Sequence, residues 1–176
     1  AASTMRSFSD EFRSGTFEIL QTRPLSKWQV VNGKFFGSLI VAVIAILPTL
    51  VYYFSINHLA STSGIDAGKA TGSYLGLFLL TAVFTSIGIC ISSFTTNAVV
   101  AFILSLIACV LLYFGFSAIS ELPVFSNGAD YYIEMLGIDF HYRSISRGVL
   151  DTRDVIYFLS LICFFLLLTR QNLRKR

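Results

Sequence analysis

The sequence predicts an all-α polytopic membrane protein with four transmembrane helices in its 176 residues, and three observations support this class. Hydrophobic residues make up 55% of the chain and charged residues only 13%, whereas an ordinary soluble domain has about 45–50% and about 25%. The mean hydropathy is +0.71. Finally, four long stretches contain no Asp, Glu, Lys or Arg: Phe35–Ile56, Ser73–Ser92, Ala98–Ile119 and Val155–Thr169.

These uncharged stretches define the expected spans. A helix needs roughly 20 apolar residues to cross a hydrocarbon core of about 30 Å, and the first three stretches satisfy this requirement. The fourth is short, and we expect Asp154 and Arg170 to mark its two ends, with local thinning of the bilayer. The spans are then about 35–56, 73–92, 98–119 and 154–170. The alternative, four buried helices of a large soluble α-protein, would need a longer chain to wrap them.

The basic residues predict the orientation of the chain. Nine of the thirteen Lys and Arg lie before the first span or after the last one. Because basic residues collect on the cytosolic side, we expect both ends to be cytosolic. The chain then divides into a cytosolic segment (1–34), a transmembrane domain (35–170) and a basic cytosolic tail (171–176). The net charge of +3 therefore reflects membrane topology and not nucleic-acid binding.

The cytosolic segment, residues 1–34, is predicted to contain two helices. The first lies within Ser7–Leu20 and is interrupted at Gly15, and Pro24 then breaks the chain. Ser26 and Gln29 fit a capping box, so a new helix is expected to begin there and to run into the first span. Trp28 on this helix suits the headgroup level of a bilayer.

Within the transmembrane domain, the sequence predicts a kink and a hairpin. Pro48 should kink the first span about one turn earlier. The link 93–97 is short enough to make spans two and three an antiparallel hairpin. Small residues recur at four-residue spacing, which lets helices approach closely, unless they reflect only a composition rich in Gly, Ala and Ser. They are Gly72 and Gly76, Gly88 and Ser92, and Ala101, Ser105 and Cys109.

The outer link, residues 120–153, is too long for a simple connection. It carries apolar residues between Tyr131 and Phe140 that do not suit a solvated loop. We expect one or two short helices on or in the outer leaflet, ended by Gly137 and Gly148. A small soluble outer subdomain is the alternative.

The sequence offers no catalytic constellation. It has no P-loop motif, so the chain is not expected to bind nucleotide itself. His58 and His141 have no metal-ligand partner at helical spacing, and no metal site is expected. The cysteines lie within apolar spans without disulfide spacing. The pattern is typical of a membrane protein that is moved by a partner, and we expect no enzymatic activity of its own.

The cytosolic segment carries a resemblance to a known family. Met5–Pro24 reads MRSFSDEFRSGTFEILQTRP, and Trp28–Lys34 reads WQVVNGK. These residues resemble the signature of ABC-2 type transporter permeases: a Glu/Arg stretch, Gly-Thr-x-Glu-x-Leu, Thr/Ser-x-Pro, and a helix ending in Gly-Lys. His141–Asp154, HYRSISRGVLDTRD, resembles the stretch before the last span of the gliding-motility-associated (GldF-like) permeases of Bacteroidetes. The resemblance covers essentially the whole chain.

The resemblance implies a function and partners. Such a permease is a subunit of an exporter in the bacterial cytoplasmic (inner) membrane, and it pairs with a second permease copy or paralogue. Separate ATP-binding subunits carry ATP-Mg, and this chain binds no cofactor itself. A short coupling helix, here about residues 23–34, docks on the ATPase, whose closure switches the spans between inward- and outward-open states. Six spans are implied for the full subunit, so the chain is expected to be its C-terminal portion.

The resemblance also implies site residues. Glu11, Arg13 and Glu18 would be docking groups, Gly15 and Pro24 joints, and Trp28 an interface anchor. The full set expected at the ATPase-coupling interface is Glu11, Arg13, Gly15, Thr16, Glu18, Arg23, Pro24, Trp28 and Lys34. The second motif comprises His141, Arg147, Gly148 and Asp151. For each charge, a solvated cytosolic face is the alternative.

Two other functions remain open at this point. The chain could be a non-transporting membrane anchor or assembly subunit of a motility or secretion machine. It could also be a membrane enzyme acting on lipid head groups through His141, Arg143 or Asp151 in the outer link.

Overall fold

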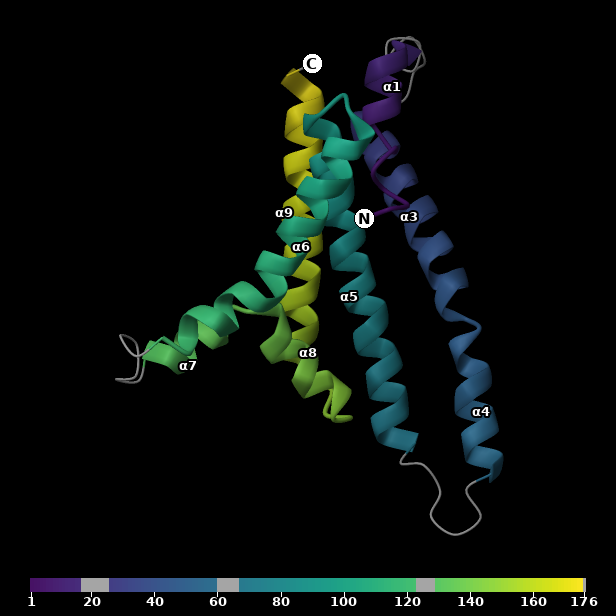
Figure 1. The fold of residues 1–176 in the computed structure, drawn as a ribbon, viewed down its shortest axis with the longest axis vertical. Helices are drawn as coiled ribbons and strands as arrows, with labels where there is room; N and C mark the ends of the chain where they lie inside the picture. The colour runs from purple at the N-terminus through teal and green to yellow at the C-terminus, as the bar shows by residue number, and fades with distance from the viewer. Residues whose placement is uncertain (17–25, 60–66, 123–128, 176) are drawn as a thin grey trace. The chain divides into compact units, whose positions relative to one another are not determined.

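The computed structural model describes residues 1–16, 26–59, 67–122 and 129–175, and all regular structure in these ranges is α-helical (Figure 1). This confirms the all-α class. The described helices are α1 (Ser9–Ser14), α3 (Lys27–Ile46), α4 (Thr49–Leu59), α5 (Ala67–Phe94), α6 (Ala98–Ser120), α7 (Ala129–Glu134), α8 (Ile138–Ser146) and α9 (Thr152–Lys175).

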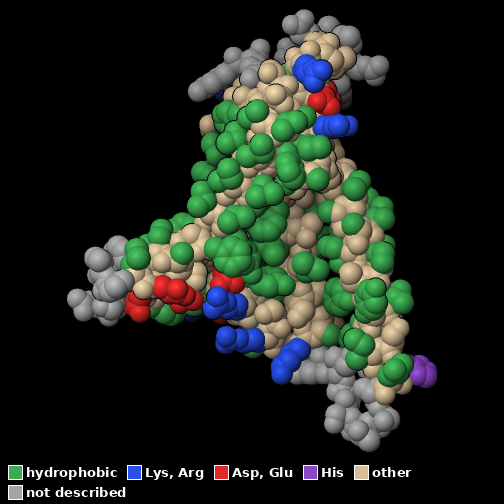
Figure 2. Space-filling model, in the orientation of Figure 1, with side chains coloured by type: hydrophobic (Ala, Val, Ile, Leu, Met, Phe, Trp, Pro, Cys, Tyr) green, Lys and Arg blue, Asp and Glu red, His purple; other side chains and the backbone are tan. Residues whose placement is uncertain are grey.

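Four segments are long and apolar enough to cross a membrane, as the sequence predicted. They are Lys27–Tyr53, Gly68–Phe94, Ala98–Ser120 and Thr152–Arg174. Figure 2 shows hydrophobic side chains covering the helices, with Lys, Arg, Asp and Glu near the helix ends. The chain is therefore a multi-pass membrane protein.

The chain divides into two compact units, and the four long helices each pass from one unit to the other. Unit 1 comprises Ala1–Val41, Thr81–Cys109 and Leu159–Arg176, and unit 2 comprises Ala42–Leu80 and Val110–Phe158. Unit 1 thus holds the start of α3, the end of α5, the start of α6 and the end of α9. Along the chain, successive long helices therefore begin in alternate units.

The start of α3 has the predicted capping box. Ser26 Oγ accepts a hydrogen bond from the Gln29 backbone N–H at 3.2 Å, and Gln29 Oε1 accepts one from the Ser26 N–H at 2.9 Å. These two bonds satisfy backbone donors that the first turn of a helix leaves unpaired. The helix then continues without a break through Lys34 to Ile46, so residues 27–34 are the first turns of the span-forming helix.

The proline in the first span interrupts the helix, but not where the sequence predicted. We expected a kink about one turn before Pro48, whereas α3 ends at Ile46 and α4 begins at Thr49. The Leu47 N–H still bonds to the Val43 carbonyl at 3.0 Å. The series of backbone hydrogen bonds is interrupted at Pro48, because proline has no N–H to donate and its ring crowds the preceding turn.

Helices α5 and α6 form the predicted hairpin. Only residues 95–97 separate them, and Asn97 Oδ1 caps α6 by accepting from the Val99 N–H at 2.9 Å. In α5, 61% of the most apolar window is buried inside the chain, against 11–22% in the other three spans. α5 is therefore the most buried of the four spans, and the other three leave more apolar surface for lipid or for another subunit.

Candidate functional site

The N-terminal segment of unit 1 is attached to the end of α5. Ser92 Oγ accepts hydrogen bonds from the backbone N–H groups of Phe8 and Ser9 at 3.0 and 3.1 Å, and it donates to the Met5 carbonyl at 3.0 Å. Phe8 occupies the N-cap position of α1 and its own side chain makes no cap bond. Ser92 therefore caps α1 from a different helix, and the hydroxyl is completely buried there.

Close packing supports this attachment. Gly88 lies one turn before Ser92 on α5, and Thr4 packs directly against its Cα, where a Cβ would clash. Thr4, Phe8 and Ser9 are completely buried. The small residues at positions 88 and 92 thus admit the N-terminal segment, whereas the sequence had suggested helix-to-helix packing for this ladder.

The same segment is attached to α3 by an ion pair. Lys34 Nζ lies 2.6 Å from Glu11 Oε1, and it also donates to the Ser7 carbonyl and sits 4.4 Å from the centroid of the Phe8 ring. The two side chains are 18% and 30% exposed. Glu11 Oε2 is buried and has no partner among the described residues. Of the predicted coupling residues, Glu11 and Lys34 therefore contact each other.

The other predicted coupling residues in this segment lie on its surface. Gly15 ends α1 in the left-handed conformation, with φ at +71°, and Arg13 and Thr16 are exposed beside it. Glu11, Arg13 and Thr16 line an open depression of about 480 Å³. Glu18, Arg23 and Pro24 lie outside the described residues.

Trp28 joins the start of α3 to the end of α9. The Arg170 guanidinium lies 5.6 Å from the Trp28 ring centroid, in a cation–π arrangement. Lys27 Nζ donates to the Leu173 carbonyl, and Leu173 is completely buried. The first and last spans thus have neighbouring ends within unit 1, which agrees with the expectation that both flanking segments lie on one side of the membrane.

In unit 2, the C-terminal end of α8 packs backbone against backbone on α5. A Cβ on Gly72 would lie 2.6 Å from the Ile145 carbonyl oxygen and 2.8 Å from the Gly148 Cα. Gly148 has a φ of +86°, a conformation that side chains with a Cβ rarely adopt. Ser73 Oγ also donates to the Ser146 carbonyl at 3.2 Å. The sequence predicted that Gly148 ends a short helix of the outer link. A glycine is required at this position by its backbone conformation and by the close approach to α5.

A buried pair connects α8 to the first turn of α9. His141 Nδ1 lies 2.6 Å from Asp154 Oδ1, and the two side chains are only 5% and 7% exposed. His141 Nε2 lies 2.9 Å from the Met135 carbonyl oxygen. The imidazole stacks on Tyr157 with ring centroids 4.0 Å apart, and the Tyr157 hydroxyl donates to the Leu136 carbonyl at 2.6 Å.

The partners of His141 determine where its protons lie. The Met135 carbonyl only accepts, so Nε2 carries a hydrogen. A nitrogen and a carboxylate oxygen at 2.6 Å also require a hydrogen between them, on either atom. In both arrangements His141 and Asp154 together have no net charge, which reduces the cost of burying them.

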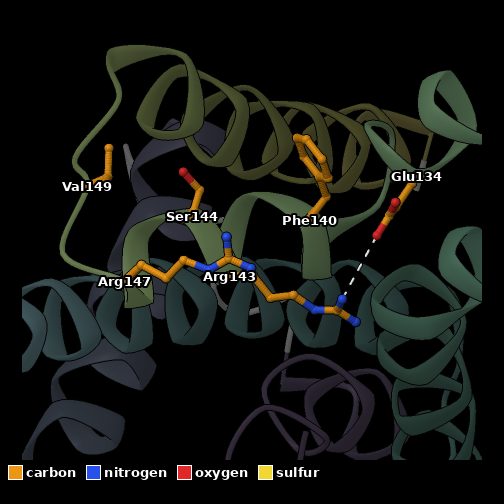
Figure 3. A pocket seen from close by; sticks show the side chains of 6 residues that line it. All are labelled: Glu134, Phe140, Arg143, Ser144, Arg147 and Val149. Carbon is orange, nitrogen blue, oxygen red and sulfur yellow. Dashed lines mark ion pairs between the residues drawn. The ribbon is translucent and has the colours of Figure 1, made fainter.

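Figure 3 shows a pocket on the surface of α8, of about 340 Å³, lined by Glu134, Phe140, Arg143, Ser144, Arg147 and Val149. The Arg143 guanidinium contacts Asp139 and lies 3.9 Å from Glu134. The hydrogen bond to Asp139 is the main reason why the pKa of Arg143 is raised above its usual value. The charge of Arg143 is therefore compensated, and Arg147 is exposed at the edge of the pocket.

Asp151, the last residue of the predicted outer motif, has a local structural role. It is exposed, and its Oδ1 accepts from the Arg153 backbone N–H at 3.0 Å, which caps α9. The four motif residues thus do not converge on one catalytic site. Among the described residues, no group of three His, Cys, Asp or Glu could hold a metal ion.

The short helices of the outer link agree with the prediction. α7 lies within 129–134, α8 begins after Gly137, and Gly148 follows the end of α8. Three structural residues were not recognised as such from the sequence: Ser92, Gly72 and Asp154. Ser92 and Gly72 had been noted only as small residues, and Asp154 only as the end of a span. Their partners are more than 10 residues away in the chain, so no local pattern indicates them.

A comparison with protein families assigns most of the chain to one family. The family model described as ABC-2 family transporter protein matches residues 1–168. No curated protein matches the chain.

Proposed function

The chain belongs to the ABC-2 family of transporter proteins, and on this basis we propose that it is the membrane-spanning permease subunit of an ABC exporter. The observation that carries the proposal is the match over residues 1–168, which includes the N-terminal segment and all four candidate spans up to the last turns of α9. A separate ATP-binding subunit would bind and hydrolyse ATP-Mg, and a second permease copy or paralogue would complete the translocation unit.

In this proposal, residues 1–34 form the ATPase-coupling surface on the cytosolic side of the bacterial inner membrane. The contacts of α1 support this role. Ser92 ties α1 to α5, and Lys34 ties it to α3 through Glu11. A partner that displaces α1 would therefore pull on two spans together, because both attachments are buried or half-buried and polar.

The predicted coupling residues have different roles in this proposal. Arg13 and Thr16 are exposed and available for direct docking, as is the adjoining depression. Glu11 and Lys34 would instead position α1, since they bind each other. Trp28 would anchor the start of α3 against the end of α9 through Arg170. Glu18 and Arg23 remain proposed docking residues, and Pro24 remains a proposed joint.

The finer assignment to a gliding-motility-associated permease rests on the resemblance of residues 141–154. An exporter of an amphiphilic cargo fits uncharged spans better than a carrier of small ions does, because no charged side chain is available at mid-span to coordinate an ion. Whether the complex moves a solute or serves as an anchor of a motility or secretion machine is decided by the experiment below.

The test purifies the tagged chain from membranes of its own source cells, identifies any P-loop ATPase that co-purifies, and reconstitutes the complex in liposomes. We expect the ATPase to co-purify with the wild-type chain and to lose this association in Arg13→Glu. The matched control is Arg147→Glu, an exposed arginine in unit 2 that should leave the association unchanged.

Ser92→Ala separates docking from coupling. It should retain the ATPase but reduce the conformational change that ATP produces in α5, measured by spin-label distances. A complex without any ATPase would overturn the proposal. An ATPase that co-purifies but is not stimulated by any lipid, glycan or drug cargo, and moves none of them, would favour the anchor.

A further inference from the structure

A second pocket in unit 2, of about 570 Å³, lies at the first turns of α9. Its lining is mostly apolar and aromatic, with Tyr132, Met135 and Leu136 from α7 and its C-terminal end, and Ile156 and Tyr157 from α9. Tyr132, Leu136 and Ile156 are 72%, 59% and 62% exposed. A hydrocarbon chain in the pocket would pack against these exposed apolar and aromatic side chains.

The inner wall of this pocket is rigid. His141 lines it and is fixed by Asp154, by the Met135 carbonyl and by stacking on Tyr157. The Tyr157 hydroxyl is bonded to the Leu136 carbonyl, so the phenol presents its ring. A preformed wall costs little ordering on binding. A bare apolar helix face, by contrast, offers a ligand no cavity of fixed shape.

One end of the pocket carries a cation. Arg153, the second residue of α9, lines it together with the apolar residues and is exposed. Two carboxylates lie near Arg153 in the chain: the charge of Asp154 is compensated by His141 at 2.6 Å, and Asp151 Oδ1 accepts from the Arg153 backbone N–H, not from its guanidinium. In the Figure 3 pocket, the charge of Arg143 is taken up by Asp139 and Glu134, and Arg147 is the second arginine of the lining.

The position along α9 indicates where the ligand comes from. Arg153 lies at the start of the candidate span Thr152–Arg174, and the apolar wall continues into that span. A cation at the end of a span lies at headgroup depth, with hydrocarbon immediately beneath it. A ligand with an anionic head group and an apolar tail fits this arrangement, in which the cation Arg153 is followed by apolar residues along α9.

We propose that this pocket binds a glycerophospholipid of the surrounding bilayer, with its phosphate on Arg153 and an acyl chain against Leu136, Ile156 and Tyr157. The bound lipid joins α7 to the head of α9. This proposal does not depend on the ATPase partner, since it concerns only the chain and the bilayer.

The test measures thermal unfolding of the purified, delipidated chain in detergent, with three additions. Dioleoyl phosphatidylglycerol should raise the Tm by about 4 °C at saturation. Dioleoylglycerol, which lacks the phosphate, should give less than half of this shift. Glycerol phosphate, which lacks the chains, should give none. Native mass spectrometry counts the phospholipid that remains bound.

Two variants locate the site. Arg153→Gln should lose most of the difference between phosphatidylglycerol and dioleoylglycerol, whereas Arg147→Gln, the matched control on the other pocket, should retain it. Leu136→Trp fills the pocket without changing charge and should reduce the bound phospholipid.

The proposal is overturned if dioleoylglycerol or glycerol phosphate alone reproduces the full shift. It is also overturned if Arg147→Gln removes the phosphate dependence as much as Arg153→Gln does. Should Arg153→Gln not fold, undiminished lipid binding by Leu136→Trp decides against the site.

Discussion

The two units each contain a close ion pair, and the pairs differ in how they are buried. Glu11–Lys34 in unit 1 and His141–Asp154 in unit 2 have the same 2.6 Å separation, and each leaves one carboxylate oxygen, Glu11 Oε2 or Asp154 Oδ2, without a partner among the described residues. The first pair is 18% and 30% exposed, but the second only 5% and 7%. Partial hydration lets a pair rearrange, whereas a dry pair holds one geometry.

This difference suits the positions of the two pairs. The Glu11–Lys34 pair attaches α1, which carries the proposed docking surface and has to move with a partner. The His141–Asp154 pair fixes α8 to α9, where a rigid wall is needed for the proposed lipid. The comparison predicts that the dry pair contributes more to stability and the half-exposed pair more to coupling.

The largest effect is expected from Asp154→Leu. Leucine has no polar atom for Nδ1, so a doubly protonated His141 would be a buried charge without a counter-charge, and a singly protonated one would leave Nδ1 buried without a hydrogen-bond partner. We expect a loss of about 3 kcal/mol in unfolding free energy. Thermal unfolding in detergent measures it. Asp151→Asn, exposed and still able to cap α9, is the control and should change stability little.

Gly72→Ala should lower the free energy of unfolding by about 2 kcal/mol. The added Cβ would clash with the backbone of Ile145 and Gly148, which cannot move away as a side chain can. Gly88→Ala in unit 1 should cost less, since its neighbour is the side chain of Thr4. Gly37→Ala has open space and should stabilise α3 by about 0.5–1 kcal/mol. Equal losses at Gly72 and Gly88 would show that the two contacts are equally rigid.

Lys34→Met should destabilise the chain by about 1–2 kcal/mol, less than Asp154→Leu, because it leaves Glu11 half-buried without its donor. Arg6→Met removes the exposed Arg6–Asp10 pair and should cost at most about 0.5 kcal/mol. Limited proteolysis of the N-terminal segment gives a second measurement. Faster cleavage in Lys34→Met than in Arg6→Met is expected, and the reverse order would contradict the assigned attachment.

The smallest effect is expected from Arg170→Gln. It removes a cation–π contact worth about 0.5–1 kcal/mol from the face of Trp28. Trp28 is the only tryptophan in the sequence, so its fluorescence reports directly on this contact. We expect a change in emission for Arg170→Gln and none for Arg147→Gln in unit 2. Unchanged emission would place Arg170 away from Trp28.

Patterns that lie within a few residues predicted much of the fold. The absence of charge located the four spans, Ser26 and Gln29 located the start of α3, and Gly148 located the end of α8. The break at Pro48 lies closer to the proline than the one turn predicted, because α3 ends at Ile46, two residues before it.

The attachments of the candidate site could not be predicted in the same way. In the sequence, Ser92 is one of several small residues in a span. In the structure it caps α1, whose first residue, Ser9, precedes it by 83 residues. Asp154 reads as the boundary of a span, because a single sequence does not show that His141 folds back onto it. The charges proposed to couple the chain to an ATPase were predicted from the family resemblance, and only the geometry separates the paired Glu11 from the exposed Arg13.

The cap that Ser92 places on Phe8 has a consequence for biosynthesis. Eighty-four residues separate the two, so α1 leaves the ribosome long before its anchor exists. At about 5–20 residues per second, the wait lasts roughly 4–17 s. During that time the nascent segment has to remain hydrated, and its two basic and two acidic residues, Arg6, Asp10, Glu11 and Arg13, favour this until the α5–α6 hairpin enters the bilayer.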